Sequence, residues 1–305
     1  MSTSATSVTV RTPAKINLCL GVGSPRDDGF HPLATVYQAV GLFDEVRARI
    51  DEPGRFSVRV HGDDAHLVPD DDTNLAVRAA WLLAQEYGVE HGVALHLHKT
   101  IPVAGGMAGG SSDAAAALVA CSTLWDIEPS RDDLLRLAAQ LGSDVPFCLV
   151  GGTAIGSGRG EQVSPVLGRG RFEWVIAIAE GELPTPDVYA EVDRLRADEE
   201  VPEPAVPTEL MAALRDGCPQ ALGGALTNDL QRAALSLRPD LAAALDAGDQ
   251  AGALGAMVSG SGPTTVFLAA DEQHVDELAG ALLAAGVCRR VLHAAGPVSG
   301  ARVVG

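Results

Sequence analysis

Alternating hydrophobic and polar positions predict β-strands over the first sixty residues. The pattern has a period of two at residues 6–12 and 15–22, and again at 35–50 and 55–62, around a Phe-Asp-Glu turn. Residues 24–32, SPRDDGFHP, are rich in turn formers and separate the second of these strands from the third. We therefore expect this part of the chain to be mostly extended.

Helices follow where apolar residues recur at intervals of three and four. Thr73 and Ser111 are the residue types that cap helix N-termini, and Gly88 and Gly142 are predicted to end helices. The expected elements are a helix at 73–87, a strand at 93–103, a helix at 111–125, a helix at 131–141, and a strand and turn at 152–163.

The pattern restarts after roughly residue 165. An acidic, proline-rich segment at 197–210 is expected to be a surface connection. The elements predicted in this half are a strand at 172–179, helices at 208–216, 229–237 and 239–256, a strand at 264–270, a helix at 271–285 and a last strand near 287–294. Because strands and helices do not alternate regularly, the order favours an α+β protein over a doubly wound parallel sheet. We predict two domains, at residues 1–165 and 166–305.

Composition and charge narrow the classes of function. Hydrophobic residues make up 47% of the 305 residues and aromatic residues only 4%, so the core must consist mostly of Ala, Val and Leu. The net charge of −18 makes nucleic acid an improbable partner, because no basic field is available to bind it. The same charge repels small anions at long range. A polyanionic ligand would need local donors and a metal ion.

The five cysteines and the absence of long apolar runs indicate in which cellular compartment the protein is expected. The cysteines are odd in number and far apart in the sequence, which indicates buried thiols in a reducing compartment and not a disulfide framework or a zinc site. The first fifteen residues lack the apolar core of a signal peptide, and no apolar run reaches the ~20 residues of a membrane span. We expect a soluble cytoplasmic protein without a membrane partner.

The stretch PVAGGMAGGSSDAAAALVAC, at residues 102–121, has the chemistry of a phosphate-binding loop. Its four glycines permit left-handed backbone angles and close approach of a ligand, and several N–H groups could then face one concavity. Ser111 and Ser112 could donate hydroxyls or coordinate hydrated Mg²⁺. The chain has Ser111 where a P-loop has lysine, so the positive charge must come from elsewhere. The alternative is a tight strand-to-helix connection with capping serines.

Three other stretches carry polar groups among apolar neighbours, and each has an ordinary structural alternative. Lys15, in PAKINLCLGV, could be an edge residue whose charged end reaches water, or a cation directed at a site. Asp144, in LGSDVPFCLVGG, could cap a short helix, or face a reacting hydroxyl. Residues 259–263, SGSGP, could be only a turn before a strand.

Taken in order, these motifs resemble those of the GHMP kinase superfamily, which includes galactokinase, homoserine kinase and mevalonate kinase. The motifs are PAKINLCLGV, PVAGGMAGGSSDAA and SGSGP, and the resemblance covers nearly the whole chain. Residues 13–46 and the stretch LGSDVPFCLVGGTAIGSGRGE are most similar to the members whose acceptor is a cytidyl-diphosphate methylerythritol. The resemblance implies a ribosomal-S5-like N-terminal domain and a ferredoxin-like C-terminal domain, with ATP-dependent phosphorylation of a hydroxyl between them.

The resemblance also implies roles for individual residues. Lys15 and Asp144 form the catalytic pair: Asp144 orients the acceptor hydroxyl and takes its proton late, while Lys15 offsets charge on the γ-phosphate. Asn17 places the methylerythritol, Phe30 and His31 recognise cytosine, and Tyr189 stacks on the base. Mg²⁺ is expected to bind mainly through phosphates and water, without a dedicated protein cage. The residues expected at ATP are Pro102, Val103, Ala104, Gly105, Gly106, Met107, Ala108, Gly109, Gly110, Ser111, Ser112, Asn74, Leu75 and Lys99.

The chain departs from the family pattern at four positions. Phe30 stands where tyrosine is usual, so a ring for stacking remains but the phenol does not. Ala104 and Ala108 replace common glycines, and Met107 replaces a common leucine. We expect the two alanine methyl groups to cost little, on the condition that both positions have negative φ.

Two other functions are considered. The first is another small-molecule kinase of the superfamily, which the Gly-Phe-His stretch together with Tyr189 disfavours, because a stacking pair needs an acceptor with a base. The second is a nucleotide-binding regulatory protein that has lost catalysis. The presence of both Lys15 and Asp144 counts against it.

Overall fold

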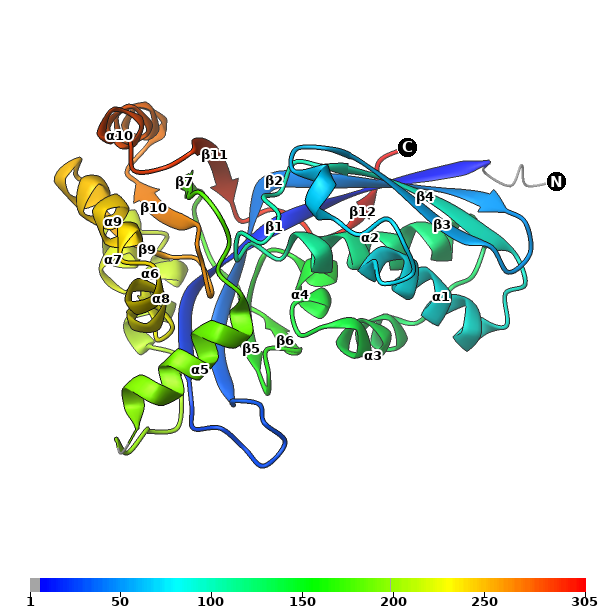
Figure 1. Ribbon diagram of the computed structural model, residues 1–305, viewed down its shortest axis with the longest axis horizontal. Helices are drawn as coiled ribbons and strands as arrows, with labels where there is room; N and C mark the ends of the chain where they lie inside the picture. Colours follow the sequence, from blue (N-terminus) through cyan, green and yellow to red (C-terminus); the bar gives the residue numbers. More distant parts are fainter. Residues whose placement is uncertain (1–5, 198) are drawn as a thin grey trace.

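The computed structural model of the chain describes residues 6–197 and 199–305, and it is a mixed α+β structure built around two sheets (Figure 1). The first five residues and residue 198, which belongs to the predicted acidic connection, lie outside this description. The order of elements confirms the prediction of an α+β class. Irregular alternation of strands and helices produces two mainly antiparallel sheets instead of one parallel sheet.

The first sheet forms the longer part of the molecule. Its strands follow the order β12-β1-β2-β4-β3, and β5 and β6 form a hairpin on the edge of β2. The bounds are β1 Ser7–Val22, β2 Leu33–Asp51, β3 Phe56–Gly62, β4 Gly92–Lys99, β5 Thr153–Ser157 and β6 Gln162–Pro165, with a short 3-10 helix η1 at Ala65–Leu67.

Four helices cover one face of this sheet (Figure 1). They are α1 Leu75–Tyr87, α2 Gly109–Leu124, α3 Arg131–Leu141 and α4 Val145–Val150. Helix α2 is buried on nearly all sides, because its alanines are small enough for the sheet and for α1 to approach it closely. The start of α2 is therefore fixed between these layers.

The second sheet has the order β11-β7-β10-β9. One face, with Trp174 and Ile176, packs toward β1 and β2, and the other, with Val175 and Ala177, is covered by helices α9 and α10. Strand β7 is therefore buried on both faces. The bounds are β7 Phe172–Ile178, β9 Gly255–Val258, β10 Thr265–Ala269, β11 Arg290–Gly296, α9 Asp240–Gln250 and α10 Glu272–Ala285.

Strand β1 connects the two parts. Its C-terminal end pairs with β8 (Thr227–Asn228), and its N-terminal end pairs with β12 (Arg302–Val303). The end of the chain thus returns to the first sheet, although the sequence pattern places it in the second domain. The remaining helices are α5 Thr185–Arg196, α6 Thr208–Asp216, α7 Pro219–Gly224 and α8 Gln231–Leu237.

Several predicted elements differ from the structure. Residues 7–22 form one strand and not two, and β2 continues through the predicted Phe-Asp-Glu turn, with the irregularity taken up by a shift in register between Pro13 and Ala14. The helix predicted at 239–256 ends at Gln250, because residues 255–258 pair with β10 instead. Helices α5 and α7 were not predicted, since their short amphipathic pattern follows proline.

The cysteines agree with the predicted thiols. Cys19, Cys121 and Cys148 are buried and free, and Cys218 and Cys288 are partly buried and free. Within residues 6–197 and 199–305, no helix has both the length and the apolar character needed to cross a membrane.

Candidate active site

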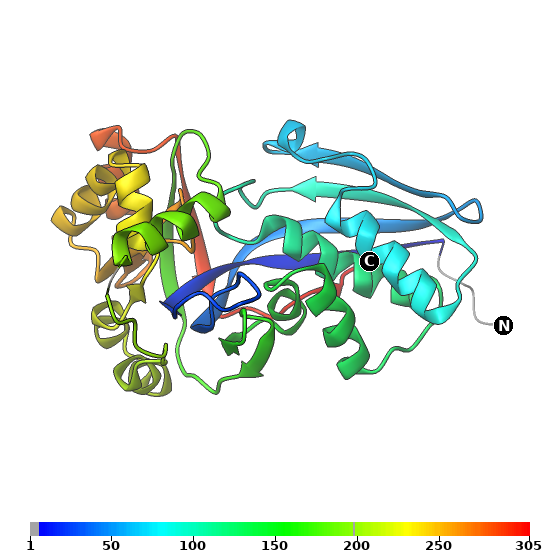
Figure 2. The same cartoon turned by 60° about the horizontal axis from the view of Figure 1, so that its bottom comes forward.

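A cavity of about 1040 Å³ lies where the two parts of the molecule meet. Its walls come from the glycine loop before α2, the loop between β1 and β2, the N-terminal half of α5 and the loop between β9 and β10. Figure 2 shows how this is possible: β1 and β2 run from the first part into the second, and their connecting loop lies beside the β5–β6 hairpin. The cavity thus collects residues that are far apart in the sequence.

The start of α2 provides unpaired N–H groups. The helix begins at Gly109 with Ala108 as its N-cap, and no side chain caps it, so the prediction of a capping serine is wrong. An alanine cannot accept the orphan N–H groups of the first turn. Ala108, Gly109, Gly110 and Ser111 all border the cavity. The bare end of a long helix, with its dipole, is therefore exposed to whatever occupies the cavity.

The two alanines of the glycine loop lie in the left-handed region, with φ of 54° at Ala104 and 61° at Ala108. Our expectation that the methyl groups cost little was conditional on negative φ, and that condition is not met. A left-handed alanine costs about 1–2 kcal/mol. Gly106 shares this conformation and has no alternative residue, because a Cβ there would lie 2.1 Å from the Ser259 carbonyl oxygen.

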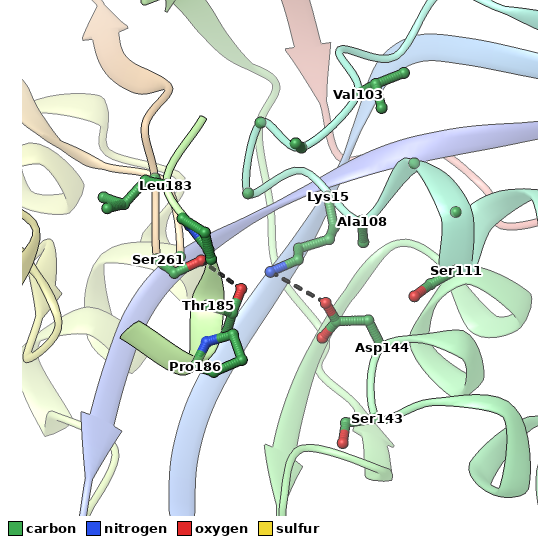
Figure 3. Close-up of a pocket in the computed structure, with 18 of the residues that line it drawn as sticks. Lys15, Val103, Ala108, Ser111, Ser143, Asp144, Leu183, Thr185, Pro186 and Ser261 are labelled. Carbon is green, nitrogen blue, oxygen red and sulfur yellow. Dashed lines mark hydrogen bonds and ion pairs between the residues drawn. The ribbon is translucent and has the colours of Figure 1, made fainter. Parts of the chain in front are cut away.

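Not every residue of the loop faces the cavity. Met107 is fully buried in the core between the two parts, and the hydroxyl of Ser112 donates a hydrogen bond of 2.8 Å to the Pro13 carbonyl. Ser111, in contrast, points into the cavity (Figure 3). The residues of the predicted ATP loop that line the cavity are Pro102, Val103, Ala104, Gly105, Gly106, Ala108, Gly109, Gly110 and Ser111.

Lys15 is a buried cation in the middle of a strand and not an edge residue. Its ammonium donates to Oδ1 of Asn17 at 2.8 Å and lies 3.4 Å from Oδ2 of Asp144 (Figure 3). It also lies over the ring of Tyr37, 5.6 Å from the centroid. The backbone N–H of Lys15 donates to the Met107 carbonyl, which ties the strand to the glycine loop. The ammonium is thus placed beside the start of α2.

Asp144 stands at the N-cap of α4, but its carboxylate makes no capping hydrogen bond. The alternative in which Asp144 is only a helix cap is therefore wrong. Its side chain is 29% exposed and faces Lys15 across the cavity (Figure 3). Burial, with the charge of Asp144 nearby, raises the pKa of Tyr37 well above 10, so its phenol stays protonated beside the ion pair.

The SGSGP segment is part of this site and not merely a turn. Oγ of Ser259 donates to the Gly106 carbonyl at 3.2 Å, and a Cβ on Gly260 would lie 3.5 Å from Nζ of Lys15. Oγ of Ser261 is 2.8 Å from Oγ1 of Thr185, the first residue of α5. The segment therefore joins the glycine loop, the lysine and α5.

Lys99 borders the cavity, but its ammonium is already bound within the protein. It donates to Asp44 and, at 2.5 Å, to Oδ2 of Asp113. Asp44 also accepts the N–H groups of Thr100 and Ile101, at 2.6 and 2.9 Å. The cluster joins the two ends of the glycine loop, since Lys99 ends β4 and Asp113 lies in α2. The proximity of Lys99 to adenine stays a prediction.

Asp113 is the least satisfied member of this cluster. Its Oδ1 is buried and has no hydrogen-bond partner among the described residues. Burial raises the pKa of Asp113 to about 7, against the charge of Lys99, which lowers it. Burial thus makes the ionised form of Asp113 costly, and Lys99 offsets part of that cost.

The predicted adenine residues Asn74 and Leu75 also border the cavity, and the side-chain amide of Asn74 is hydrogen-bonded to the neighbouring backbone. Asn74, not Thr73, is the N-cap of α1: its Oδ1 accepts from the N–H of Ala76 at 2.9 Å. Its Nδ2 donates to the Pro69 carbonyl at 2.7 Å. Both polar atoms are thus engaged, and recognition of adenine by Asn74 stays a prediction.

An aromatic cluster of Phe30, His31 and Tyr189 forms another part of the cavity wall. Nδ1 of His31 lies 2.8 Å from the Gly23 carbonyl, and Nε2 lies 3.5 Å from Asp193. The rings of His31 and Tyr189 are 5.1 Å apart, and Phe30 is 49% exposed beside them. Because a carbonyl only accepts, Nδ1 carries a hydrogen. The cluster offers flat apolar faces and few polar groups.

Sequence reasoning missed several residues that border the cavity, among them Tyr37, Asp113, Arg159 and Asp193. Asp193 follows Tyr189 by four residues, so prediction of α5 would have placed both on one helix face. Arg159 lies between two glycines in GSGRGE, a turn signal that was noted without a role. Tyr37 and Asp113 have no local signal, because only the tertiary structure brings them to the site.

Comparison with known proteins gives a consistent result. Residues 74–152 match the model of the GHMP kinases N-terminal domain, and residues 210–288 match that of the GHMP kinases C-terminal domain. The chain is 57% identical to a 4-diphosphocytidyl-2-C-methyl-D-erythritol kinase of Thermobifida fusca, over 98% of this chain and 99% of that protein.

Two solved structures are also similar. A crystal structure of 4-(cytidine 5'-diphospho)-2C-methyl-D-erythritol kinase superposes with a TM-score of 0.76 and 33% identity, over 94% of this chain and 98% of the other. A homoserine kinase from Cytophaga hutchinsonii also has a TM-score of 0.76 at 19% identity, over 100% of this chain and 99% of that one. At that identity the second likeness shows the two-domain fold alone.

Replacement of Ala104 by glycine should stabilise the protein. Ala104 is exposed, so the change relieves left-handed strain without loss of packing, and the free energy of unfolding should rise by up to ~1 kcal/mol. Ala243→Gly, at an exposed position within α9, is the matched control and should lower it by about 1 kcal/mol. Urea unfolding measures both. Equal destabilisation by the two changes would contradict the assigned conformation.

The pKa of Asp113 makes a prediction about stability. The pKa of this carboxyl is ~3.9 in the unfolded chain and about 7 in the folded protein, so its ionisation does not reduce the free energy of unfolding below pH ~4. The cost then grows up to pH 7 and stays constant above it. Asp113→Asn should therefore be stabilised relative to the wild type as pH rises from 4 to 8, on the order of a few kcal/mol. A difference in unfolding free energy that does not change with pH would contradict this assignment.

Proposed function

The chain belongs to the GHMP kinases and, within them, to the 4-diphosphocytidyl-2-C-methyl-D-erythritol kinases, and from this premise we propose the reaction it catalyses. It transfers the γ-phosphoryl group of ATP to the 2-hydroxyl of 4-diphosphocytidyl-2-C-methyl-D-erythritol, in the non-mevalonate route to isoprenoid precursors. The observation that carries the proposal is the position of the Lys15–Asp144 pair, between the bare start of α2 and the aromatic cluster.

The phosphates of ATP bind at the glycine loop. The uncapped N–H groups of α2 and the hydroxyl of Ser111 supply donors there, and the helix dipole favours the negative charge. Lys15 lies in β1, outside the glycine loop, but its backbone is hydrogen-bonded to that loop and its ammonium lies beside it. This accounts for a phosphate-binding loop that has no lysine of its own.

Phosphoryl transfer passes through a loose transition state, so position and charge contribute most of the rate. Asp144 lies beside Lys15, borders the cavity and makes no helix-capping bond, so its carboxylate can accept a hydrogen bond from the acceptor hydroxyl. A carboxylate is a weak base toward an alcohol, so it takes the proton late, when the forming P–O bond has acidified the hydroxyl. Lys15 holds Asp144 in place through their ion pair and offsets charge on the transferred group.

The aromatic cluster determines the choice of acceptor. Phe30 and Tyr189 offer faces on which cytosine can stack, and the His31 ring, next to that of Tyr189, is held by the Gly23 carbonyl and by Asp193. Asn17 borders the cavity beside Lys15 and is assigned to the methylerythritol hydroxyls, for which the second hydrogen of its amide remains, since the amide already accepts from Lys15 and donates to Thr35. Homoserine and mevalonate carry no base and would leave these rings exposed.

Magnesium would be held mainly by ATP. The described residues contain no group of three His, Cys, Asp or Glu side chains suited to a metal ion. The oxygens that face the phosphate region are the Ser111 hydroxyl and the Asp144 carboxylate, which are hard donors suitable for Mg²⁺ or its water shell. When bound, the ion would neutralise part of the phosphate charge that a protein of net charge −18 cannot.

The reaction itself is tested by phosphorus NMR. Incubation of the protein with ATP, Mg²⁺ and 4-diphosphocytidyl-2-C-methyl-D-erythritol should yield ADP and a new phosphomonoester signal. Parallel incubations with homoserine and with mevalonate should yield none. A signal with homoserine or mevalonate, and none with the cytidyl compound, would reject the proposal.

Asp144→Asn should reduce kcat by at least about two orders of magnitude, because the acceptor hydroxyl loses its proton acceptor. KM for both substrates should change little, since the asparagine keeps the shape of the site. Steady-state kinetics measure the split. Ser143→Ala is the neighbouring control, because its hydroxyl points away from Lys15 (Figure 3), and it should keep normal turnover. Near-normal kcat in Asp144→Asn would remove Asp144 from the mechanism.

Removal of divalent cations should abolish turnover and leave recognition of the base intact. We expect no product in the presence of excess EDTA, and full recovery when Mg²⁺ is restored. Binding of cytidine, measured by calorimetry, should be the same with and without EDTA, because the aromatic cluster needs no metal. Full activity in EDTA would show that the chain's own cations suffice.

A further inference from the structure

The cations that border the cavity differ in how far they are neutralised. Its Lys and Arg side chains are Lys15, Lys99 and Arg159. Lys15 faces Asp144, and Lys99 lies between two buried carboxylates. Within the described part of the chain, no carboxylate lies within 4.0 Å of the Arg159 guanidinium. Arg159 is therefore a half-buried positive charge in the wall of the cavity, with no direct ion-pair partner among the described residues, and its charge reaches the Asp28 carboxylate only from farther away.

The turn between β5 and β6 holds Arg159 in place. The backbone N–H of Arg159 donates to Oε2 of Glu161 at 2.6 Å, so this nearby carboxylate is used by the backbone and not by the guanidinium. The Gly158 carbonyl accepts from the N–H of Leu33 at 2.8 Å, which fixes the turn to the start of β2. The backbone of Arg159 is thus held by a closed hydrogen-bonded turn, from which the side chain extends to Phe30.

This turn contacts both ends of the acceptor site. The Arg159 guanidinium lies over the ring of Phe30, 4.7 Å from its centroid, which places the charge beside the aromatic cluster. At the other end, the carbonyl of Gly160 is 3.5 Å from the Tyr37 hydroxyl, and the Tyr37 ring lies under Lys15. A ligand that stacks on Phe30 and reaches Asp144 must pass this turn.

We propose that Arg159 binds the diphosphate of the acceptor and so selects acceptors that carry one. This inference rests on the proposed function, in which the acceptor joins a base to a polyol through a diphosphate. That group lies between the base and the reacting hydroxyl, as the turn lies between Phe30 and Tyr37. A guanidinium matches phosphate oxygens in a two-pronged geometry. Lys15 lies beside Asp144, where the hydroxyl reacts, and is therefore assigned to the γ-phosphate of ATP and not to the diphosphate of the acceptor.

Binding of cytidine, CMP and CDP separates recognition of the base from recognition of the phosphates. Calorimetry without ATP or Mg²⁺ measures each Kd for the wild type, Arg159→Met and Arg159→Lys. In the wild type, affinity should rise from cytidine to CDP, and added salt should weaken CDP binding but not cytidine binding. Arg159→Met should lose about 10-fold or more of the CDP gain while its cytidine Kd stays within about threefold. Arg159→Lys should retain part of the gain.

Each other outcome has a distinct meaning. If Arg159→Met keeps the full gain from cytidine to CDP, Arg159 does not bind the diphosphate. If the variant weakens all three ligands by the same factor, Arg159 acts only by packing on Phe30, and the inference also fails. If the wild type binds none of the three, the proposed function fails together with the inference. ATP binding and the unfolding midpoint of Arg159→Met should match the wild type, which confirms that the variant is folded.

Discussion

Repulsion between a protein of net charge −18 and its phosphate-rich substrates is the constraint on which this site depends. Salt screens the repulsion beyond about 10 Å, so the positive ends of dipoles and a few cations are enough if they are local. The bare start of α2, the buried ammonium of Lys15 and the guanidinium of Arg159 meet this need in different parts of one cavity. Lys99 also borders the cavity, but Asp44 and Asp113 neutralise its charge, so it holds the glycine loop in shape and does not attract phosphate.

The cavity exists because β1 and β2 belong to both parts of the molecule. β1 carries Lys15 and Asn17 at the junction, and β2 carries Tyr37 beside them. The second part contributes the SGSGP segment and α5 to the same cavity. These two are joined by the hydrogen bond between Ser261 and Thr185. The glycine loop, the Lys15–Asp144 pair and the aromatic cluster are therefore held by continuous strands and direct hydrogen bonds, and their spacing does not depend on a flexible linker.

The sequence was sufficient where chemistry is local. Glycines before an apolar helix, a lysine between apolar strand residues and an aspartate before proline all lie at the cavity. It was insufficient where a residue's role comes from a distant partner. Asp113 has a raised pKa because the fold buries its carboxylate, and the charge of Lys99, which β4 brings beside it, opposes that rise. Arg159 matters because its turn is paired with the start of β2. The left-handed φ of Ala104 also has no local signal, because an alanine gives no indication of that conformation in the sequence.

The central claim is that the loop holds the phosphates of ATP while Lys15 acts on the group being transferred. The most direct test is Lys15→Met, with ATP affinity measured by calorimetry and the rate of phosphoryl transfer measured in a single turnover. We expect ATP affinity within several-fold of the wild type and a transfer rate lower by about two to three orders of magnitude, as for loss of a preorganised charge. Loss of ATP affinity in proportion to the rate, or an unchanged rate, would contradict the account.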